Sequence, residues 1–175
     1  MIFGSSVDLY PISLDDTSLI VKWRNSPQVK ENFIFRDDIT PENHIEYYRK
    51  YIETGKIEQF MIVEKATSSS IGCVYLRDID YQNSRAEFGI FIGEDSCRGK
   101  GYGRESTLLL CSYGFETLNL HKIMLRVFPF NKSAIRMYES VGFKQEAYLK
   151  DDIKVNGKYE DIIFMSLLCN GKHPK

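Results

Sequence analysis

A chain of 175 residues is long enough to form one domain with a hydrophobic core. Apolar residues make up 43% and charged residues 27% of the chain, a balance that is typical of a globular protein and excludes a disordered one. The net charge of −1 gives no general reason to expect a nucleic-acid partner, so any site for an anion has to be local.

Cysteine and histidine residues are few and scattered. The four cysteines form no CxxC pair and the three histidines are equally dispersed, so we expect neither a disulfide framework nor a metal site. The sequence opens without a basic segment followed by an apolar run, and no apolar stretch is long enough to cross a bilayer. We therefore expect a cytoplasmic protein with a single domain over residues 1–175 and without nucleic acid or membrane as a partner.

Strand and helix patterns alternate in the first half of the chain. Thr40 before Pro41 favours an N-cap with proline in the first helical turn, and Gly55 favours a C-terminal stop. Strands are expected over residues 7–12, 60–64 and 71–76, and helices over 15–24, from Ser26 and Pro27 onwards, and between Thr40 and Gly55.

The second half continues the mixed pattern. Residues 86–92 are expected to form a strand, and the apolar residues that follow the next loop fall at helical spacing. The remaining expected elements are a strand over 122–128, a helix over 133–141 and closing strands over 143–149 and 162–168. This order predicts a mixed α/β (α+β) domain without an internal repeat or a linker.

The loop after residues 86–92 reads SCRGKGYGRE and combines glycines with basic residues. The first N–H groups of a helix have no partner within the helix and can bind a phosphate, glycines give it access, and Arg98, Lys100 and Arg104 add positive charge. The loop lacks the Ser or Thr that follows GK in a Walker A loop, and its GxGxG spacing differs from the dinucleotide fingerprint. A glycine-rich surface turn is the alternative.

Motifs in the second half carry a resemblance to a known family. The pattern RxxGxG (Arg98, Gly101 and Gly103), the segment NKSAIRMYESVGF, the strand NLHKIMLRV and the closing DDIKVNGKYEDIIFMSLL resemble the GNAT superfamily of acyl-CoA N-acyltransferases over residues 86–168. The resemblance implies a twisted, mostly antiparallel central sheet flanked by helices, with central strands that splay apart to admit coenzyme A. It also implies an N-acetyltransferase that uses acetyl-CoA as co-substrate and a small-molecule amine as acceptor, with a homo-oligomer left open.

The resemblance assigns the coenzyme A site to the glycine loop and to the strand before it. The pyrophosphate would lie on the loop amides, the pantetheine arm would follow the backbone of the strand, and Asn131 would contact the arm and cap the following helix. The expected cofactor-binding residues are Ile90, Phe91, Ile92, Arg98, Gly99, Lys100, Gly101, Tyr102, Gly103, Arg104 and Asn131.

Direct acetyl transfer in a ternary complex needs a neutral amine and an acid for the leaving thiolate. Glu87 matches a strand position where many members of the superfamily carry a base, and its alternative role is an ion pair with an arginine. Tyr138 matches the tyrosine that approaches the coenzyme sulfur, and a phenol with a pKa of about 10 suits an acid; a core tyrosine is the alternative. Cys97 lacks an adjacent histidine, so we expect no covalent intermediate there.

The acceptor is indicated less clearly. The segment VKWRNSPQVKENF (residues 21–33) resembles bacterial acetyltransferases that act on nucleotide-linked amino sugars. We expect this acceptor first, with Trp23, Arg24 and Asn25 as substrate-binding residues and Arg24 on the diphosphate.

Three other functions remain open. The carboxyl half resembles spermidine acetyltransferases, and an acidic group in the amino half would attract a polyamine or form a solvated face. That group consists of Glu31, Asp37, Asp38 and Glu42. Ribosomal-protein N-terminal acetyltransferases resemble the carboxyl half as well, and a sensor that binds acyl-CoA without catalysis is the alternative from a different class.

Overall fold

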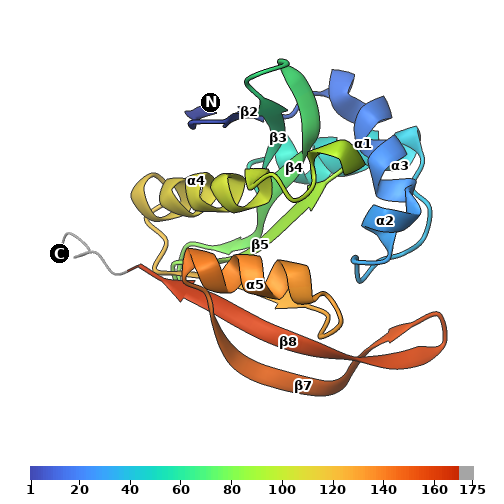
Figure 1. The fold of residues 1–175 in the computed structure, drawn as a ribbon, viewed down its shortest axis with the longest axis vertical. Coiled ribbons are helices and arrows are strands. Elements are labelled where there is room, and N and C mark those ends of the chain that lie inside the picture. The colour runs from blue at the N-terminus through green and yellow to red at the C-terminus, as the bar shows by residue number, and fades with distance from the viewer. Residues whose placement is uncertain (170–175) are drawn as a thin grey trace.

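Residues 1–169, which the computed structural model describes, form one sheet of eight strands with helices against both faces (Figure 1). The strands are β1 (Ile2–Phe3), β2 (Val7–Pro11), β3 (Glu58–Glu64), β4 (Ser69–Asp80), β5 (Arg85–Ile92), β6 (Lys122–Val127), β7 (Lys144–Val155) and β8 (Lys158–Leu168). The helices are α1 (Thr17–Asn25), α2 (Pro27–Lys30), α3 (Pro41–Tyr47), α4 (Tyr102–Glu116) and α5 (Lys132–Val141). The strand order is β1-β2-β3-β4-β5-β6-β8-β7, and only β5 and β6 pair in parallel within this part of the chain.

The two faces of the sheet bury different side chains. On one face, Leu110 of α4 and Tyr138 of α5 join a core cluster with Phe88 of β5. On the other face, Trp23 of α1 packs with Phe91, which points to the opposite side of the same strand. Figure 1 shows the same division, with α4 and α5 on one side of the central strands and α1, α2 and α3 on the other.

The parallel pair β5–β6 is short, and the strands part beyond it. Pairing runs only from Arg85 with Lys122 to Glu87 with Met124. Along its other edge, β5 stays paired with β4 as far as Ile92. The five residues 88–92 therefore present a free backbone edge toward the gap, which confirms the predicted splay between the two central strands.

The third helix begins and ends close to where the sequence predicts. The Thr40 side chain accepts a hydrogen bond from the Asn43 amide at 3.2 Å, Asn43 reaches back to the Thr40 amide, and Pro41 is the first helical residue. The α-helix then continues as a π-helix over Tyr48–Ile52. Gly55 follows with a φ of 70°, the left-handed conformation that glycine adopts without strain.

Two features of the sheet differ from the sequence prediction. The closing strands are longer than expected, because β7 and β8 form one hairpin around Asn156 and Gly157, which both have positive φ. The added residues are mainly polar and exposed, so apolar alternation does not reveal them. The strand β1 was not expected, since its two residues are too few for a periodic pattern.

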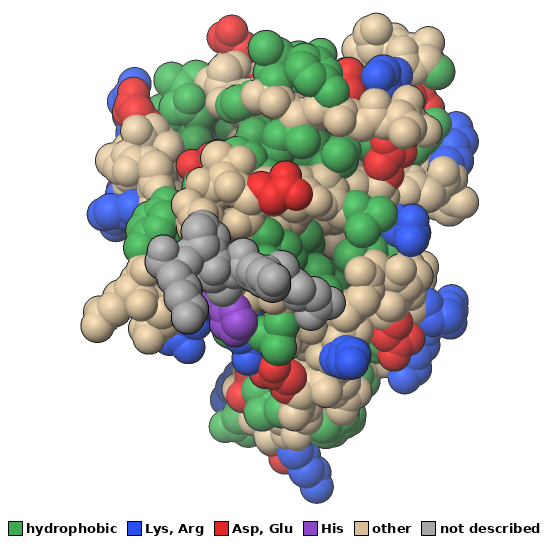
Figure 2. Space-filling view, turned by 90° about the vertical axis from the view of Figure 1, so that its left-hand side faces the viewer, with side chains coloured by type: hydrophobic (Ala, Val, Ile, Leu, Met, Phe, Trp, Pro, Cys, Tyr) green, Lys and Arg blue, Asp and Glu red, His purple; other side chains and the backbone are tan. Residues whose placement is uncertain are grey.

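Surface charge is mixed rather than concentrated on the face that Figure 2 shows. Figure 2 shows basic, acidic and hydrophobic side chains interspersed over one face of the molecule, without an extended basic patch on that face. None of the helices within residues 1–169 combines the length and the apolar character needed to cross a membrane.

Candidate active site

A cavity of about 820 Å³ lies where β5 and β6 part. Its walls come from α1, α2, α3 and the segment between α2 and α3, from strands β3, β4, β5 and β6, and from the glycine loop with the starts of α4 and α5. The expected site residues that line it are Arg24, Glu87, Ile90, Phe91, Ile92, Arg98, Gly99, Gly101, Tyr102, Gly103, Arg104, Asn131 and Tyr138. Trp23, Asn25 and Lys100 are not among the lining residues.

The glycine loop leaves room for a ligand against its backbone. Gly99 and Gly101 have φ values of 75° and 87°, and Gly101 is the N-cap of α4. A Cβ atom added at Gly99, Gly101 or Gly103 would meet no atom within 4 Å. Open space therefore lies next to the unpaired amides of the first turn of α4, and a pyrophosphate group fits such a cradle.

Side chains around the loop are held by specific contacts. Arg98 Nε lies 3.2 Å from a carboxylate oxygen of Asp95, and its Nη2 donates to the Ile92 carbonyl at 3.1 Å. Arg104 Nε donates to the Ser140 hydroxyl at 3.2 Å. These contacts fix the loop against β5 and α5, whereas Lys100 is exposed and is not among the residues that line the cavity.

Tyr138 combines a buried ring with a place in the cavity lining. Its ring packs edge-on against Phe88, with centroids 6.1 Å apart, and against Phe143 at 5.7 Å. Burial raises the pKa of Tyr138, so the hydroxyl stays protonated at neutral pH. Tyr138 thus occupies both of its predicted environments, the core and the cavity wall.

Glu87 accepts hydrogen bonds from two arginines. Arg77 Nη2 donates to its Oε1 at 2.5 Å, and Arg126 Nη2 donates to both carboxylate oxygens at 3.2 Å. The three side chains come from β4, β5 and β6, so the ion pairs connect the strands at the point where the sheet divides. This geometry matches the predicted alternative, an arginine-paired glutamate.

Asn131 begins α5 and also contacts the opposite wall of the cavity. Its Oδ1 accepts from the Ala134 amide at 3.2 Å, which caps the helix as expected. Its Nδ2 donates to the Asn32 side chain at 2.8 Å. The two asparagines therefore join α5 to the segment between α2 and α3.

Of the three expected acceptor residues, only Arg24 lines the cavity. Its guanidinium lies over the Phe33 ring, 3.4 Å from the centroid. Trp23 is 1% exposed and donates from its indole nitrogen to Glu94 at 2.7 Å, so it belongs to the core. Asn25 makes two hydrogen bonds to the Ile39 backbone, at 2.8 and 2.9 Å, and anchors the segment between α2 and α3 to α1.

Sequence reasoning missed several polar residues at the cavity end that Arg24 lines, which we call the acceptor end. They are His44 and Tyr47 of α3 and Tyr75 and Arg77 of β4. The spacing of Tyr75 and Arg77, two residues apart on a strand, indicates that both face the same side of the sheet. Cys73, on the same side of the strand, is buried. Polar residues on a side of a strand that also carries a buried residue are the signal by which the sequence could have indicated Tyr75 and Arg77 as site residues.

His44 is the most buried of these residues. Its Nδ1 lies 3.1 Å from the Thr17 hydroxyl, and its buried Nε2 has no hydrogen-bond partner. Burial lowers the pKa of His44, against a weaker opposing effect of Asp16, so the imidazole is neutral at pH 7.

Comparison with known proteins agrees with this geometry. A model of the acetyltransferase (GNAT) domain matches residues 7–144. The chain belongs to the GNAT acetyltransferase family. It is 38% identical over 123 residues to a spermidine N(1)-acetyltransferase of Vibrio cholerae, and the match covers 70% of each chain. It is also 30% identical over 174 residues to the N-acetyltransferase p20 of Bacillus licheniformis, and this match covers 95% of each chain. The structure of a V. cholerae spermidine N-acetyltransferase with CoA and spermine superposes with a TM-score of 0.87, at 30% identity over 94% of this chain and 96% of that one.

This GNAT protein is an N-acetyltransferase that depends on acetyl-CoA. The predicted fold is confirmed, including the mostly antiparallel sheet with helices on its faces. For the acceptor, the comparisons favour the polyamine alternative over the amino-sugar nucleotide that we expected first.

Proposed function

We propose that the protein transfers an acetyl group directly from acetyl-CoA to a primary amine of a polyamine, within a ternary complex. The observation that carries this proposal is a single cavity that joins the glycine loop, Tyr138 and the acceptor end, in a chain 38% identical to a spermidine N(1)-acetyltransferase. Both substrates can occupy such a cavity at once, so no covalent enzyme intermediate is needed.

Coenzyme A would bind along the glycine loop and the free edge of β5. The loop amides from Arg98 to Arg104 would hold the pyrophosphate, where a Cβ-sized space is open at each glycine. The pantetheine amides would pair with the backbone edge of residues 90–92, which β6 leaves free. Asn131, on the opposite wall, would contact the arm from the N-terminus of α5.

Tyr138 would protonate the thiolate that leaves when the amine attacks the thioester carbonyl. The same burial that raises the pKa of the phenol also disfavours a thiolate beside it, so the pKa values of the phenol and the thiol rise together. A protonated phenol next to the sulfur can then donate its hydrogen as the carbon–sulfur bond breaks.

Glu87 would help to position the acceptor rather than remove its proton. A primary ammonium with a pKa of about 10.4 must lose a proton before it attacks, and water in the cavity can carry this proton away. Glu87 already accepts hydrogen bonds from Arg77 and Arg126, which orients its carboxylate toward β4 and β6. Its role as the direct base is the alternative that a Glu87→Gln variant tests.

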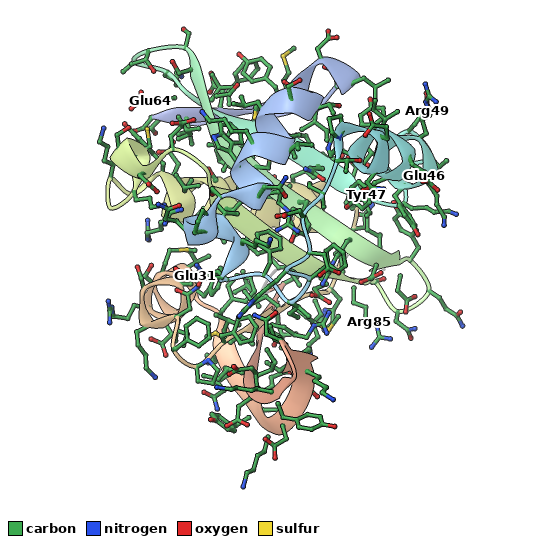
Figure 3. All side chains as sticks on the ribbon, turned by 90° about the vertical axis from the view of Figure 1, so that its right-hand side faces the viewer. Glu31, Glu46, Tyr47, Arg49, Glu64 and Arg85 are labelled. Atoms are coloured by element: carbon green, nitrogen blue, oxygen red, sulfur yellow. The ribbon has the colours of Figure 1, made fainter. Side chains whose placement is uncertain are left out.

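A polyamine would be drawn to the acidic group on the segment around the acceptor end. Glu31, Asp37, Asp38 and Glu42 are exposed and alternate in sequence with residues that line the cavity, such as Phe35 and Ile39. Figure 3 shows Glu31 and Tyr47 well apart, so within this group Glu31 lies away from the acceptor end. Such a rim would raise the local concentration of a polycation without contacting the reacting amine.

A second acceptor class is favoured by Arg24. A guanidinium in the cavity wall recognises phosphate through a planar fork, which suits the nucleotide-linked amino sugar of the sequence analysis. The same charge repels an ammonium group. Arg24 is therefore the residue that separates the two acceptors.

The test is CoA release from acetyl-CoA with spermidine and with a nucleotide-linked 4-amino sugar. We expect turnover of spermidine that weakens as salt screens the acidic rim, and a loss of kcat/KM when Asp37, Asp38 and Glu42 are changed to their amides. Turnover of the amino-sugar nucleotide alone, with a strong rise in KM in Arg24→Ala, would replace the polyamine by the second acceptor class.

A further inference from the structure

Four side chains at the acceptor end bring hydrogen-bond donors together. Arg24 lies on α1, Tyr47 on α3, and Tyr75 and Arg77 on β4, and all four line the cavity. Burial is the main cause of the shifted pKa values of Arg24 and Tyr47, and each lies near enough to the other three side chains for them to affect its pKa as well. The four therefore form one cluster, which we call the donor cluster.

Two nitrogens of the donor cluster are buried without a hydrogen-bond partner. They are Nη1 of Arg24 and Nε of Arg77. A buried guanidinium nitrogen that has lost water without gaining a partner costs free energy, so a ligand that accepts from it binds favourably. Burial also lowers the pKa of Arg24, because removal of the guanidinium from water disfavours its charged form.

Few carboxylates compensate the positive charge of the cluster. Glu87 bonds to Arg77 Nη2 but is shared with Arg126, and Asp78 lies 3.8 Å from Arg77 Nε with an exposed side chain. Arg24 makes no ion pair within residues 1–169, and its cation instead lies over Phe33. The cavity lining at the acceptor end thus carries an excess of positive charge, whereas the acidic group of Glu31, Asp37, Asp38 and Glu42 lies outside this lining.

We infer that the donor cluster is a subsite for an anionic group, a phosphate or a carboxylate. Two guanidinium groups supply charged donors in forks, and two phenols add neutral O–H donors. Burial raises the pKa of both Tyr47 and Tyr75, so both hydroxyls keep their hydrogens and can donate. The Arg24 guanidinium is held in place by the Phe33 ring, which reduces the ordering that binding requires.

The anion could come from the acceptor itself or from a free anion bound beside it. An acceptor that carries both an amine and a phosphate or carboxylate would place its anion on the cluster and its amine toward the thioester. A polyamine would bring further ammonium groups toward two guanidinium groups, which repel them. This consequence for the acceptor rests on the proposed acetyl transfer, whereas the subsite itself does not.

The first test measures binding of inorganic phosphate to the CoA-saturated protein by calorimetry. CoA occupies the glycine loop, so a second anion has to bind elsewhere. We expect saturable binding that weakens about tenfold or more in Arg24→Gln and severalfold in Tyr47→Phe, which keeps the ring packing. The matched control is Arg49→Gln, because Arg49 is exposed on the outer side of the π-helix that follows α3 (Figure 3) and carries the same charge.

Absence of saturable phosphate binding to the folded, CoA-saturated wild type would overturn the subsite, and so would equal weakening in Arg24→Gln and Arg49→Gln. If Arg24→Gln fails to fold, Tyr47→Phe carries the comparison. If phosphate does not bind but amines are acetylated, the subsite is wrong and the proposed function stands. If phosphate binds as expected and no amine is acetylated, the subsite stands and the proposed function fails.

The second test separates the two sources of the anion with a matched pair of acceptors, 2-aminoethyl phosphate and 1,3-diaminopropane. An anion carried by the acceptor predicts a higher kcat/KM for the phosphate compound, and a loss of about tenfold or more in Arg24→Gln for that compound alone. A free anion predicts that the diamine is preferred and that added phosphate leaves this preference in place. Unchanged kinetics for both acceptors in Arg24→Gln would remove the cluster from acceptor recognition.

Discussion

Burial sets the chemistry available to Tyr138, whose phenol stays protonated because its pKa is raised. Tyr138→Phe keeps the ring between Phe88 and Phe143 and removes only the hydroxyl. We expect kcat to fall about a hundredfold or more while the Kd of acetyl-CoA changes little, since a general acid acts only in the transition state. Tyr113→Phe on α4 is the control and should keep full activity. An unchanged kcat in Tyr138→Phe, with chemistry rate-limiting, would assign Tyr138 to packing alone.

The raised pKa of Tyr138 also predicts how stability depends on pH. Above pH 10 the tyrosine ionises in the unfolded chain but not in the folded one, so the free energy of unfolding falls as pH rises. Each such tyrosine contributes a slope of up to about 1.4 kcal/mol per pH unit. Urea unfolding between pH 8 and 11 should show a shallower loss in Tyr138→Phe than in the wild type. Parallel curves would mean that the phenol ionises equally in both states.

Glu87 offers a third test at the residue scale. Glu87→Gln leaves Arg77 and Arg126 without their shared carboxylate, and we expect the free energy of unfolding to fall by about 1–3 kcal/mol with kcat reduced less than tenfold. Asp38→Asn removes a carboxylate from an exposed pair with Lys30 and should change stability by less than about 0.5 kcal/mol. A large loss of kcat without a loss of stability would instead make Glu87 the base.

At the scale of an element, the glycine loop can be tested apart from backbone strain. Gly101→Val places a side chain in the open space beside α4 and forces a residue at φ 87° into a strained conformation. Gly55→Val imposes the same kind of strain at φ 70°, also with open space, at the end of the π-helix. We expect both variants to lose stability and only Gly101→Val to lose acetyl-CoA binding, by about tenfold or more in calorimetry. Normal binding by Gly101→Val would remove the loop from the coenzyme site.

The segment between α2 and α3 is an element whose position depends on one side chain. Asn25 bonds to both backbone groups of Ile39, and the segment lines the acceptor side of the cavity with Phe33 and Phe35. Asn25→Ala should therefore raise the acceptor KM severalfold and leave the Kd of acetyl-CoA unchanged. Equal losses for both substrates would point to a general loss of folding rather than to a released segment.

At the scale of the whole molecule, the sequence predicted the architecture and the coenzyme end of the cavity better than the acceptor end. The glycine loop, Asn131 and Tyr138 belong to local sequence motifs, so the sequence alone predicts that they line the cavity. Arg24, Tyr47 and Arg77 meet only because α1, α3 and β4 pack together, and no local pattern encodes this meeting. The prediction that Trp23 binds substrate is wrong for the same reason. Trp23 precedes Arg24 on α1, and adjacent helical residues point in different directions, so Arg24 lines the cavity while Trp23 packs in the core.

The central claim is acetyl transfer to a small primary amine, and the most direct measurement is amine-dependent release of CoA from acetyl-CoA with the product identified by mass spectrometry. The panel contains spermidine, a nucleotide-linked 4-amino sugar, 2-aminoethyl phosphate and a peptide with an amino-terminal serine. We predict a product heavier than its amine by one acetyl group for at least one small amine, and loss of this product in Tyr138→Phe. Tight binding of acetyl-CoA with no acetylated amine from any member of the panel would contradict the claim and favour a protein that senses acyl-CoA.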